Sequence, residues 1–442
     1  MKLMIKKIVF DYSKSDVSKS QSNQLMAKLT PELRQIGQSR SLAYETDYAS
    51  INLPFDKSML EKIQKVVTQK KNLSPSLFIV IGIGGSNLGT IAVHEALNGV
   101  LYNEKNPNTK VYFADTVDTD YLFDLYAITE AYLQQKKIIL INVVTKSGTT
   151  TETIINFQIF LNLLKKYHPD NYHDYVVVTT DIDSPLWNYA YSQKMIRLEV
   201  PKNVGGRYSV FSAVGLFPLG MLDVDLEELC TGARDAIEYS TSLELDKNMA
   251  ALSAILIYQN YLQGKIIDDT FLFSVEFEAI GKWYRQLMGE SIGKEFDRVG
   301  KKVEVGITPT VSIGSIDLHS VAQLYLGGPR DKFTTFILLK ETKEKIIIPK
   351  LDQENLVADI TGKSVKAIMQ AIEKGTRNAY EKSKRPFCSF ILEDKSAYCI
   401  GELLQIKMLE MIYLGFLFNI NPFDQPAVEK YKEETRKILS HG

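Results

Sequence analysis

Hydroxyl side chains gather around a single lysine in the stretch TKSGTTTET, residues 145–153. The stretch follows an apolar run at 137–144 that predicts a strand, and it precedes an amphipathic pattern that predicts a helix. At the start of a helix, hydroxyl groups, free backbone N–H groups and the ammonium group of Lys146 can converge on phosphate oxygens. Ser and Thr are also good helix caps, but a cap requires only one of them. The stretch therefore favours a phosphate site over bare capping.

A second candidate anion site is the glycine-rich stretch FIVIGIGGSNLGTIAVHEAL, residues 78–97. A strand, a glycine turn and a helix in this order leave backbone N–H groups free at the helix N-terminus, where the dipole favours an anion. The dinucleotide fingerprint G-x-G-x-x-G fails, because its last glycine falls on Asn87 when counted from Gly82. The P-loop pattern fails too, because the stretch contains no lysine. A phosphate or phosphosugar is favoured, while a dinucleotide with Asp115 as its ribose-binding acid, or a purely structural turn, stay as alternatives.

Two further charged residues stand beside glycines. Arg207 follows paired glycines in NVGGRYSVFSAVGLFPLG, residues 203–220, and could present a planar cation to an oxyanion. Glu290 lies near the end of a helical pattern in YRQLMGESIGKE, residues 284–295. Taken alone, Arg207 is equally well explained as an arginine in a surface turn, and a lone glutamate near a helix end, such as Glu290, is usually a solvated surface charge.

Histidine is scarce, with five in the chain. His319, in GSIDLHSVAQLYLGG, follows a polar turn and is the best candidate for acid–base chemistry. His94, on the helix after the glycine turn, is either a core histidine or a residue that contacts the site residues without contacting the substrate. The stretch GFLFNINPFDQPAVEKYK, residues 415–432, places Gln425 and Lys432 near the start of a predicted terminal helix. Taken alone, this stretch is better explained as a docked C-terminal helix with an exposed polar face than as part of a site.

These residues require a scaffold, and the chain predicts an α/β one. Short apolar runs alternate with longer helical patterns, which indicates parallel sheets covered by helices. The predicted strands are 77–83, 110–114, 137–144, 175–180, 195–200, 270–275, 333–339 and 387–393. The segment 226–263 reads as helical and connects two such sheets. The expected division is an N-terminal helical or irregular segment at 1–60, a first domain at 61–240 and a second at 241–442.

Composition excludes several partners. The 442 residues contain 52 Lys plus Arg and 53 Asp plus Glu, so no global field attracts nucleic acid or an anionic membrane. Cys230, Cys388 and Cys399 are too scattered for a disulfide framework or a thiolate metal site, which fits a reducing cytoplasm. We expect neither a signal peptide nor a membrane span, because the apolar runs are too short or carry charge.

Taken together, the motifs resemble the glucose-6-phosphate isomerase (phosphoglucose isomerase) family in its shorter bacterial form. The resemblance covers residues 78–432, and GGRYSVFSAVG and GFLFNINPFDQPAVEKYK are its most specific parts. GIGGSNLG, TKSGTTTE, GESIGKE and DLHSVAQL occur in the family's order as well. The chain departs from the family pattern at Lys202, where an acidic or small residue is usual, at Thr145, where serine is common, and at Ile292, which interrupts ESNGK.

The resemblance implies two sugar-isomerase (SIS) type domains, each a parallel sheet flanked by helices. It implies that Glu290 transfers the proton, that Arg207 stabilises the enediolate, that His319 and Lys432 open the sugar ring, and that Glu152 orients His319. It implies a phosphate site at Thr145, Lys146, Ser147 and Thr150, and a sugar site at Gly85, Ser86, Gln286 and Gln425. It also implies a homodimer in which His319 serves the Glu290 site of the partner, a sugar-phosphate substrate, and no metal or cofactor.

Two other functions remain open at this stage. A sugar-phosphate sensor on the same domains would bind without turnover, although Glu290, His319 and Lys432 together argue against it. An isomerase of a related phosphosugar, such as mannose 6-phosphate, is a closer competitor to the function that the resemblance implies. A dinucleotide-dependent oxidoreductase is contradicted by the failed fingerprint.

Overall fold

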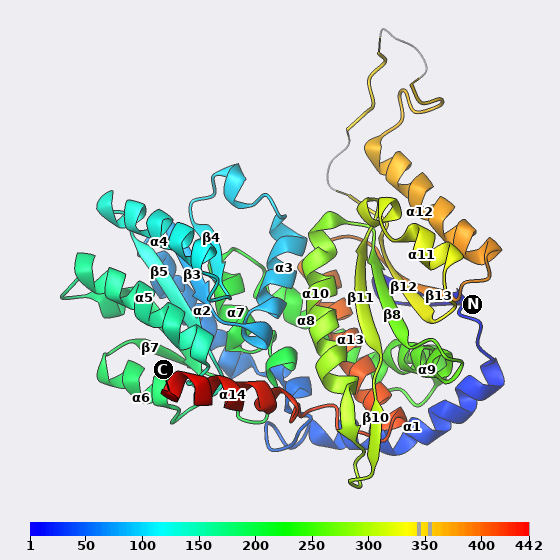
Figure 1. The fold of residues 1–442 in the computed structure, drawn as a ribbon, viewed down its shortest axis with the longest axis horizontal. Coiled ribbons are helices and arrows are strands. Elements are labelled where there is room, and N and C mark those ends of the chain that lie inside the picture. Colours follow the sequence, from blue (N-terminus) through cyan, green and yellow to red (C-terminus); the bar gives the residue numbers. More distant parts are fainter. Residues whose placement is uncertain (343–345, 352–355, 442) are drawn as a thin grey trace.

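The computed structural model describes residues 1–342, 346–351 and 356–441. Two α/β units lie side by side, each built on a sheet with helices on both faces (Figure 1). The predicted fold class, α/β with parallel sheets flanked by helices, is confirmed.

The first sheet is parallel throughout, with the strand order β4-β3-β5-β6-β7. Its strands are β3 (Leu77–Ile81), β4 (Lys110–Ala114), β5 (Ile139–Val144), β6 (Val176–Thr180) and β7 (Ile196–Glu199). Each corresponds to a run predicted from the sequence. The runs are apolar at successive positions because helices bury both faces of the sheet.

Alternate side chains of these strands face two different helical layers. Leu77, Ile79 and Ile81 pack with helices α4 (Thr119–Gln134), α5 (Thr151–Tyr167) and α6 (Pro185–Ser192). Phe78 and Val80 pack on the other side with α2 (Lys57–Lys71), α3 (Leu88–Asn98) and α7 (Ala213–Met221). This two-residue alternation is the direct consequence of the strand pleat.

The chain reverses its direction of winding at β3. From β3 it passes to β4 on one side and then to β5 on the other, so the carboxyl ends of β3 and β5 flank a topological switch point. In open α/β sheets, ligands bind in the crevice outside such a point. The glycine turn after β3 and the hydroxyl-rich loop after β5 both lie there.

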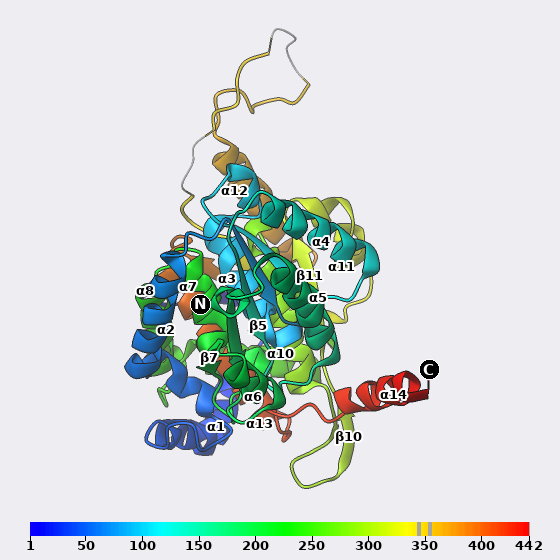
Figure 2. The same ribbon diagram turned by 90° about the vertical axis from the view of Figure 1, so that its left-hand side faces the viewer.

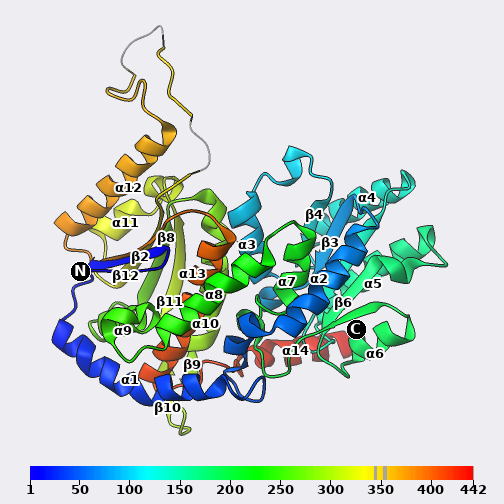
Figure 3. The same cartoon turned by 180° about the vertical axis from the view of Figure 1, so that it is seen from behind.

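The second sheet has the order β1-β2-β13-β12-β8-β11. Its parallel part consists of β8 (Ile267–Leu272), β11 (Thr308–Ile313), β12 (Lys332–Leu339) and β13 (Phe387–Leu392). Helices α11 (Ala322–Gly327) and α12 (Val365–Lys382) cover one face, where Phe271, Phe336 and Tyr380 pack together. The other face carries α8 (Leu226–Ser240), α9 (Met249–Leu262), α10 (Glu278–Ile292) and α13 (Ala397–Leu417) (Figure 3). The predicted helical connector is thus α8 and α9.

The N-terminal segment contains two strands that the sequence prediction of a helical or irregular segment at 1–60 did not include. Strands β1 (Lys2–Ile5) and β2 (Ile8–Lys14) form a hairpin, and β2 pairs antiparallel with β13 at the edge of the second sheet. The hairpin was missed because its apolar runs are short and are separated by a turn at Lys6, whose φ is 57°. Helix α1 (Lys19–Ser39) follows. The domain boundaries at residues 60 and 240 stay predictions.

Helices α3, α10 and α13 occupy the middle of the molecule, between the two sheets (Figure 1). Helix α10 is followed by a small hairpin of β9 (Lys294–Phe296) and β10 (Lys302–Val305). The last helix, α14 (Val428–His441), projects away from both units, as Figure 2 shows from the side. None of the described helices is long and apolar enough to cross a lipid bilayer.

Candidate active site

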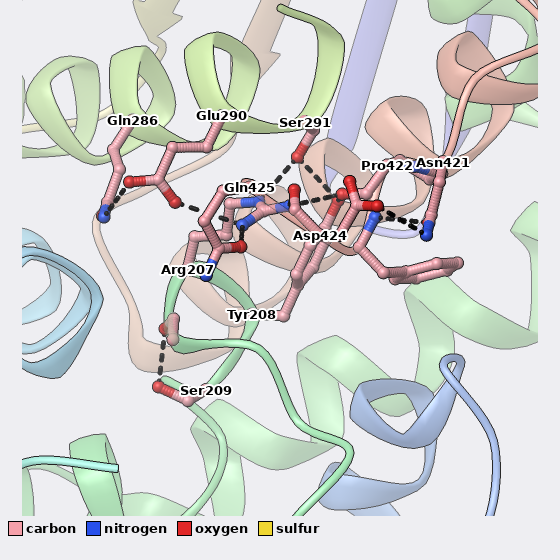
Figure 4. Close-up of polar contacts among 12 residues, drawn as sticks. Arg207, Tyr208, Ser209, Gln286, Glu290, Ser291, Asn421, Pro422, Asp424 and Gln425 are labelled. Atoms are coloured by element: carbon pink, nitrogen blue, oxygen red, sulfur yellow. Dashed lines mark hydrogen bonds and ion pairs between the residues drawn. The ribbon is translucent and has the colours of Figure 1, made fainter. Parts of the chain in front are cut away.

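Arg207 lies in a short 3₁₀ turn, Gly206–Tyr208, and its side chain is almost completely buried. A buried guanidinium is costly unless its donors are satisfied. Here the side chain donates to acceptors from two distant parts of the chain, so its position is closely determined (Figure 4). The acceptors are Ser291 Oγ (2.8 Å), Glu290 Oε2 (3.1 Å), Gln425 Oε1 (2.7 Å) and the carbonyl oxygens of Pro422 (2.5 Å) and Asp424 (3.1 Å).

Glu290 lies in the last turn of α10 and faces Arg207. Its Oε2 accepts from Arg207 Nη1, and its Oε1 accepts from Gln286 Nε2 at 3.0 Å, one helical turn earlier. The carboxylate side chain keeps 29% of its surface exposed. A carboxylate held between two donors and still open to solvent can exchange a proton with a bound molecule.

The segment before α14 is tied to the same place. Lys294 Nζ donates to the backbone carbonyls of Glu290 and Asp424, at 2.6 Å each, and lies 3.2 Å from Asp424 Oδ1. Burial lowers the pKa of Lys294, and the charge of Arg207 lowers it further, while Asp424 raises it. Together with the Gln425 contact to Arg207, these bonds join the end of α10 to the C-terminal segment.

The first glycine turn packs directly on this cluster. A Cβ atom at Gly85 would lie 2.2 Å from the carbonyl carbon of Gly206, so only glycine allows this approach. Gly84 has a φ of +58°, and a Cβ there would lie 3.0 Å from Gln286 Nε2. The two glycines therefore allow the glycine turn to pack closely against the Arg207 turn and against α10.

The hydroxyl-rich loop lies at the carboxyl end of β5, beside the glycine turn. Thr145 Oγ1 lies 2.9 Å from Thr150 Oγ1. Thr150 is the N-cap residue of α5, but its side chain makes no capping hydrogen bond. The first N–H groups of α5 are therefore not capped by Thr150, which a phosphate at this helix end could exploit.

Lys146 and Ser147 complete this loop. Burial lowers the pKa of Lys146, Asp181 raises it and Lys202 lowers it. Ser147 is exposed, and its Oγ accepts from the backbone N–H of Thr149 at 3.2 Å. The loop thus presents a cation and hydroxyls at the switch point.

Comparison with known protein families matches the chain to one of them. The family model described as "Phosphoglucose isomerase" matches residues 58–442, most of the chain. The chain belongs to the phosphoglucose isomerase family. The resemblance stated from the motifs is therefore confirmed.

Individual members of this family align with most of this chain. A glucose-6-phosphate isomerase from Alkaliphilus metalliredigens is 32% identical over 443 residues, covering 98% of this chain and 95% of the relative. One from Carboxydothermus hydrogenoformans is 33% identical over 386 residues, or 86% of this chain and 81% of the relative. Among solved structures, a hypothetical protein from Thermus thermophilus superposes with a TM-score of 0.85 at 29% identity, covering 98% of this chain and 99% of that one.

Four of the residues predicted as the phosphoglucose isomerase site are brought together in one hydrogen-bonded group: Arg207, Glu290, Gln286 and Gln425. Three others are not joined to it within this chain. His319 is exposed at the end of a 3₁₀ turn, Ile316–His319, after β11. Lys432, on α14, pairs with Glu429 at 2.7 Å, and Glu152 lies in the first turn of α5. Between them and Glu290 the described chain forms no hydrogen bond or ion pair.

Sequence reasoning missed the residues that form supporting hydrogen bonds to Arg207 and to the backbone of Glu290. Ser291 accepts from Arg207 Nε, lies 2.9 Å from Tyr208 Oη, and directly follows Glu290 in a motif already identified. Lys294 lies in the same motif. Ile292, which interrupts the family pattern ESNGK, is fully buried in the core, and the neighbouring Glu290 carboxylate accepts hydrogen bonds from Gln286 and Arg207.

His94 is a core residue. It is 4% exposed, and burial lowers its pKa to about 4. Its Nδ1 lies 3.1 Å from Asn98 Nδ2, and its ring packs edge-on against Tyr102. A neutral, enclosed imidazole is suited to packing and not to substrate proton transfer.

Proposed function

We propose that this protein is an aldose–ketose isomerase that interconverts glucose 6-phosphate and fructose 6-phosphate, a step of glycolysis and gluconeogenesis. The observation that carries the proposal is the Glu290 carboxylate, held between Arg207 and Gln286 and still partly exposed. Membership of the phosphoglucose isomerase family supports the choice of substrate pair.

The reaction moves a proton between C2 and C1 of the open-chain sugar through an enediol. Glu290 takes the proton from C2 of the aldose, and the C1 carbonyl oxygen takes up a proton to give the enediol. Glu290 then returns its proton to C1 while the C2 hydroxyl loses its proton and becomes the ketone carbonyl, so that in sum one proton moves from C2 to C1 and one from O2 to O1. One carboxylate can reach both carbons, so the same group serves as base and as acid. Negative charge gathers on the oxygens of the intermediate, and the fixed guanidinium of Arg207 is suited to stabilise it.

The phosphate group of the substrate binds at the loop formed by Thr145, Lys146, Ser147 and Thr150. The N-terminus of α5 and the ammonium of Lys146 supply positive charge there. The sugar lies between this loop and Glu290, against Gly85, Ser86, Gln286 and Gln425. The position of the loop at the topological switch point supports this assignment.

Ring opening uses His319 and Lys432, and Glu152 orients His319. Within one chain these residues stand apart from Glu290, and His319 and the projecting helix α14 are largely exposed. An isolated helix of this length is marginal in water, so α14 requires a partner surface. These observations support a homodimer in which His319 completes the Glu290 site of the other protomer. The three buried, free cysteines support a cytoplasmic location.

A coupled assay tests the proposal. Purified protein is given fructose 6-phosphate, and glucose 6-phosphate is detected by a dehydrogenase, with mannose 6-phosphate assayed in parallel. Saturable formation of glucose 6-phosphate at a rate above that of a Glu290→Gln sample is expected. Binding of fructose 6-phosphate without turnover would instead indicate a sensor, and faster turnover of mannose 6-phosphate would indicate the related isomerase.

A further inference from the structure

Asp181 lies directly behind the loop that carries Lys146. It follows β6, and its backbone N–H donates to the carbonyl oxygen of Lys146 at 3.2 Å. Thr180 Oγ1 donates to the same carbonyl at 3.2 Å. The Oδ1 atom of Asp181 is buried and accepts no hydrogen bond from the described residues. A carboxylate oxygen is therefore enclosed beside the candidate phosphate loop with no donor among these residues.

The next strand brings Lys202 to the same place. Thr180 pairs with Glu199 of β7, and the Val200 N–H donates to the Thr180 carbonyl at 3.0 Å. The exposed Lys202 follows two residues later. The charged groups that face Asp181 are Lys146 from the β5 loop, and Glu199 and Lys202 from the β7 end.

We propose that Asp181 and Lys202 set the affinity of the Thr145–Thr150 loop for the substrate phosphate, in opposite directions. The carboxylate of Asp181 repels a phosphate dianion bound beside Lys146 and weakens binding, while Lys202 attracts it. The inference rests on the proposed function only in placing the phosphate at this loop. Neither residue touches the reacting carbons, so each acts on binding and not on proton transfer.

The effect of Asp181 changes with pH. Burial raises its pKa to about 6, against the lowering effects of Lys146 and Lys202. Asp181 is therefore mainly charged above this pH and mainly neutral below it. Acidification removes one negative charge beside the loop, so the affinity for a dianion should rise.

The test measures sulfate binding by calorimetry, because sulfate stays a dianion over the range used and binding needs no turnover. At about pH 7.5 we expect Asp181→Asn to lower the Kd by about two- to five-fold and Lys202→Gln to raise it similarly, as a single charge several ångströms away in a solvated site would do. The double variant should return to about the wild-type Kd. The KM for fructose 6-phosphate should follow the same order, with kcat nearly constant.

The pH series separates this role from a general structural one. Wild type and Asp181→Asn should differ at about pH 7.5 and converge near pH 5, where the wild-type carboxyl is neutral. Asp183→Asn and Lys194→Gln, which make the same charge changes at exposed positions around α6, should leave the Kd unchanged.

Three results would overturn the inference: wild-type protein that binds no sulfate, an Asp181→Asn variant that binds it no more tightly, or curves that stay apart at low pH. Failure of the proposed function is distinguishable from these. It would show as absent isomerase activity in wild-type protein whose sulfate binding still follows the expected charge order.

Discussion

The ion pair between Arg207 and Glu290 joins a fixed cation to an accessible carboxylate. Arg207 Nη1 lies 3.1 Å from Glu290 Oε2, and the two side chains are 1% and 29% exposed. The guanidinium is held by Ser291, Gln425 and two backbone carbonyls, whereas the carboxylate has only Gln286 as a further side-chain donor among the described residues. Charge stabilisation requires a rigid group and proton transfer between two carbons requires a movable one, so the asymmetry suits the two proposed roles.

Replacing Glu290 by Gln should remove proton transfer and preserve binding. The amide keeps the size of the side chain but cannot accept the proton, so we expect kcat to fall by about 100-fold or more, with KM changed little. Steady-state kinetics on fructose 6-phosphate provide the measurement. Glu278→Gln, at the other end of α10, is the matched control and should retain activity. Near-normal turnover of purified Glu290→Gln would exclude Glu290 as the base.

Lys146→Ala should weaken the binding of sugar phosphates. Loss of a charged hydrogen bond from an anion site costs about 1.5–3 kcal/mol, so KM should rise by about 10- to 150-fold. Thr150→Ala should act in the same direction, and unphosphorylated glucose and fructose should be very poor substrates. Lys166→Ala, exposed near the other end of α5, serves as the control. If Lys146→Ala left KM and inhibitor affinity unaltered, the phosphate site would have to lie elsewhere.

Much of the scaffold could be predicted because buried strands and helices have recognisable patterns of apolar residues in the sequence. Both faces of the first sheet are covered, so its five strands read as continuous apolar runs. Strand β11 was missed because it is an edge strand whose sequence, TPTVSI, is rich in hydroxyls and contains Pro309. Edge strands need less apolar surface, and the pattern that identifies central strands is weak in them.

The sequence predicted which residue types form the site but not which of these residues contact one another. Arg207 and Gln425 are 218 positions apart, and only the packing of the two α/β units brings them to 2.7 Å. The supporting roles of Ser291 and Lys294 depend on which way α10 faces, which the motif GESIGKE alone does not state. The placement of His319 depends on a second chain and stays a prediction.

A buried acid predicts a pH dependence of stability. Asp268, on β8, is 1% exposed, and neither carboxylate oxygen accepts a hydrogen bond within the described part of the chain. Burial raises its pKa to about 8, although Lys407 lowers it. In the unfolded chain the group loses its proton near pH ~3.9. Between these values the unfolded state binds fewer protons, so the free energy of unfolding should fall as pH rises from about 4 to 8.

Asp268→Asn should remove this contribution. Relative to wild type, the variant should gain stability steadily across the same interval, as measured by urea unfolding at several pH values. Asp183→Asn, at an exposed carboxylate, should run parallel to wild type. A constant difference between Asp268→Asn and wild type at all pH values would show that Asp268 does not retain its proton on folding.

The shared-site homodimer predicts recovery of activity when two inactive variants exchange subunits. Glu290→Gln chains and His319→Ala chains should each be nearly inactive alone. A two-fold interface builds both sites from the same two surfaces, so in a mixed dimer one site receives both lesions and the other receives neither. Random equimolar exchange makes about half of the dimers mixed, and roughly a quarter of all sites should then be fully functional.

The measurement is activity before and after exchange, with exchange verified by mass spectrometry of differently tagged chains. Mixing either variant with Glu278→Gln chains, which keep both groups, controls for dilution. If each site were built within a single chain, every site in the mixture of the two inactive variants would retain one lesion. Activity that fails to rise after verified exchange would therefore rule out the contribution of His319 to the partner's site, while the assignment of Glu290 and Arg207 would stand on its own evidence.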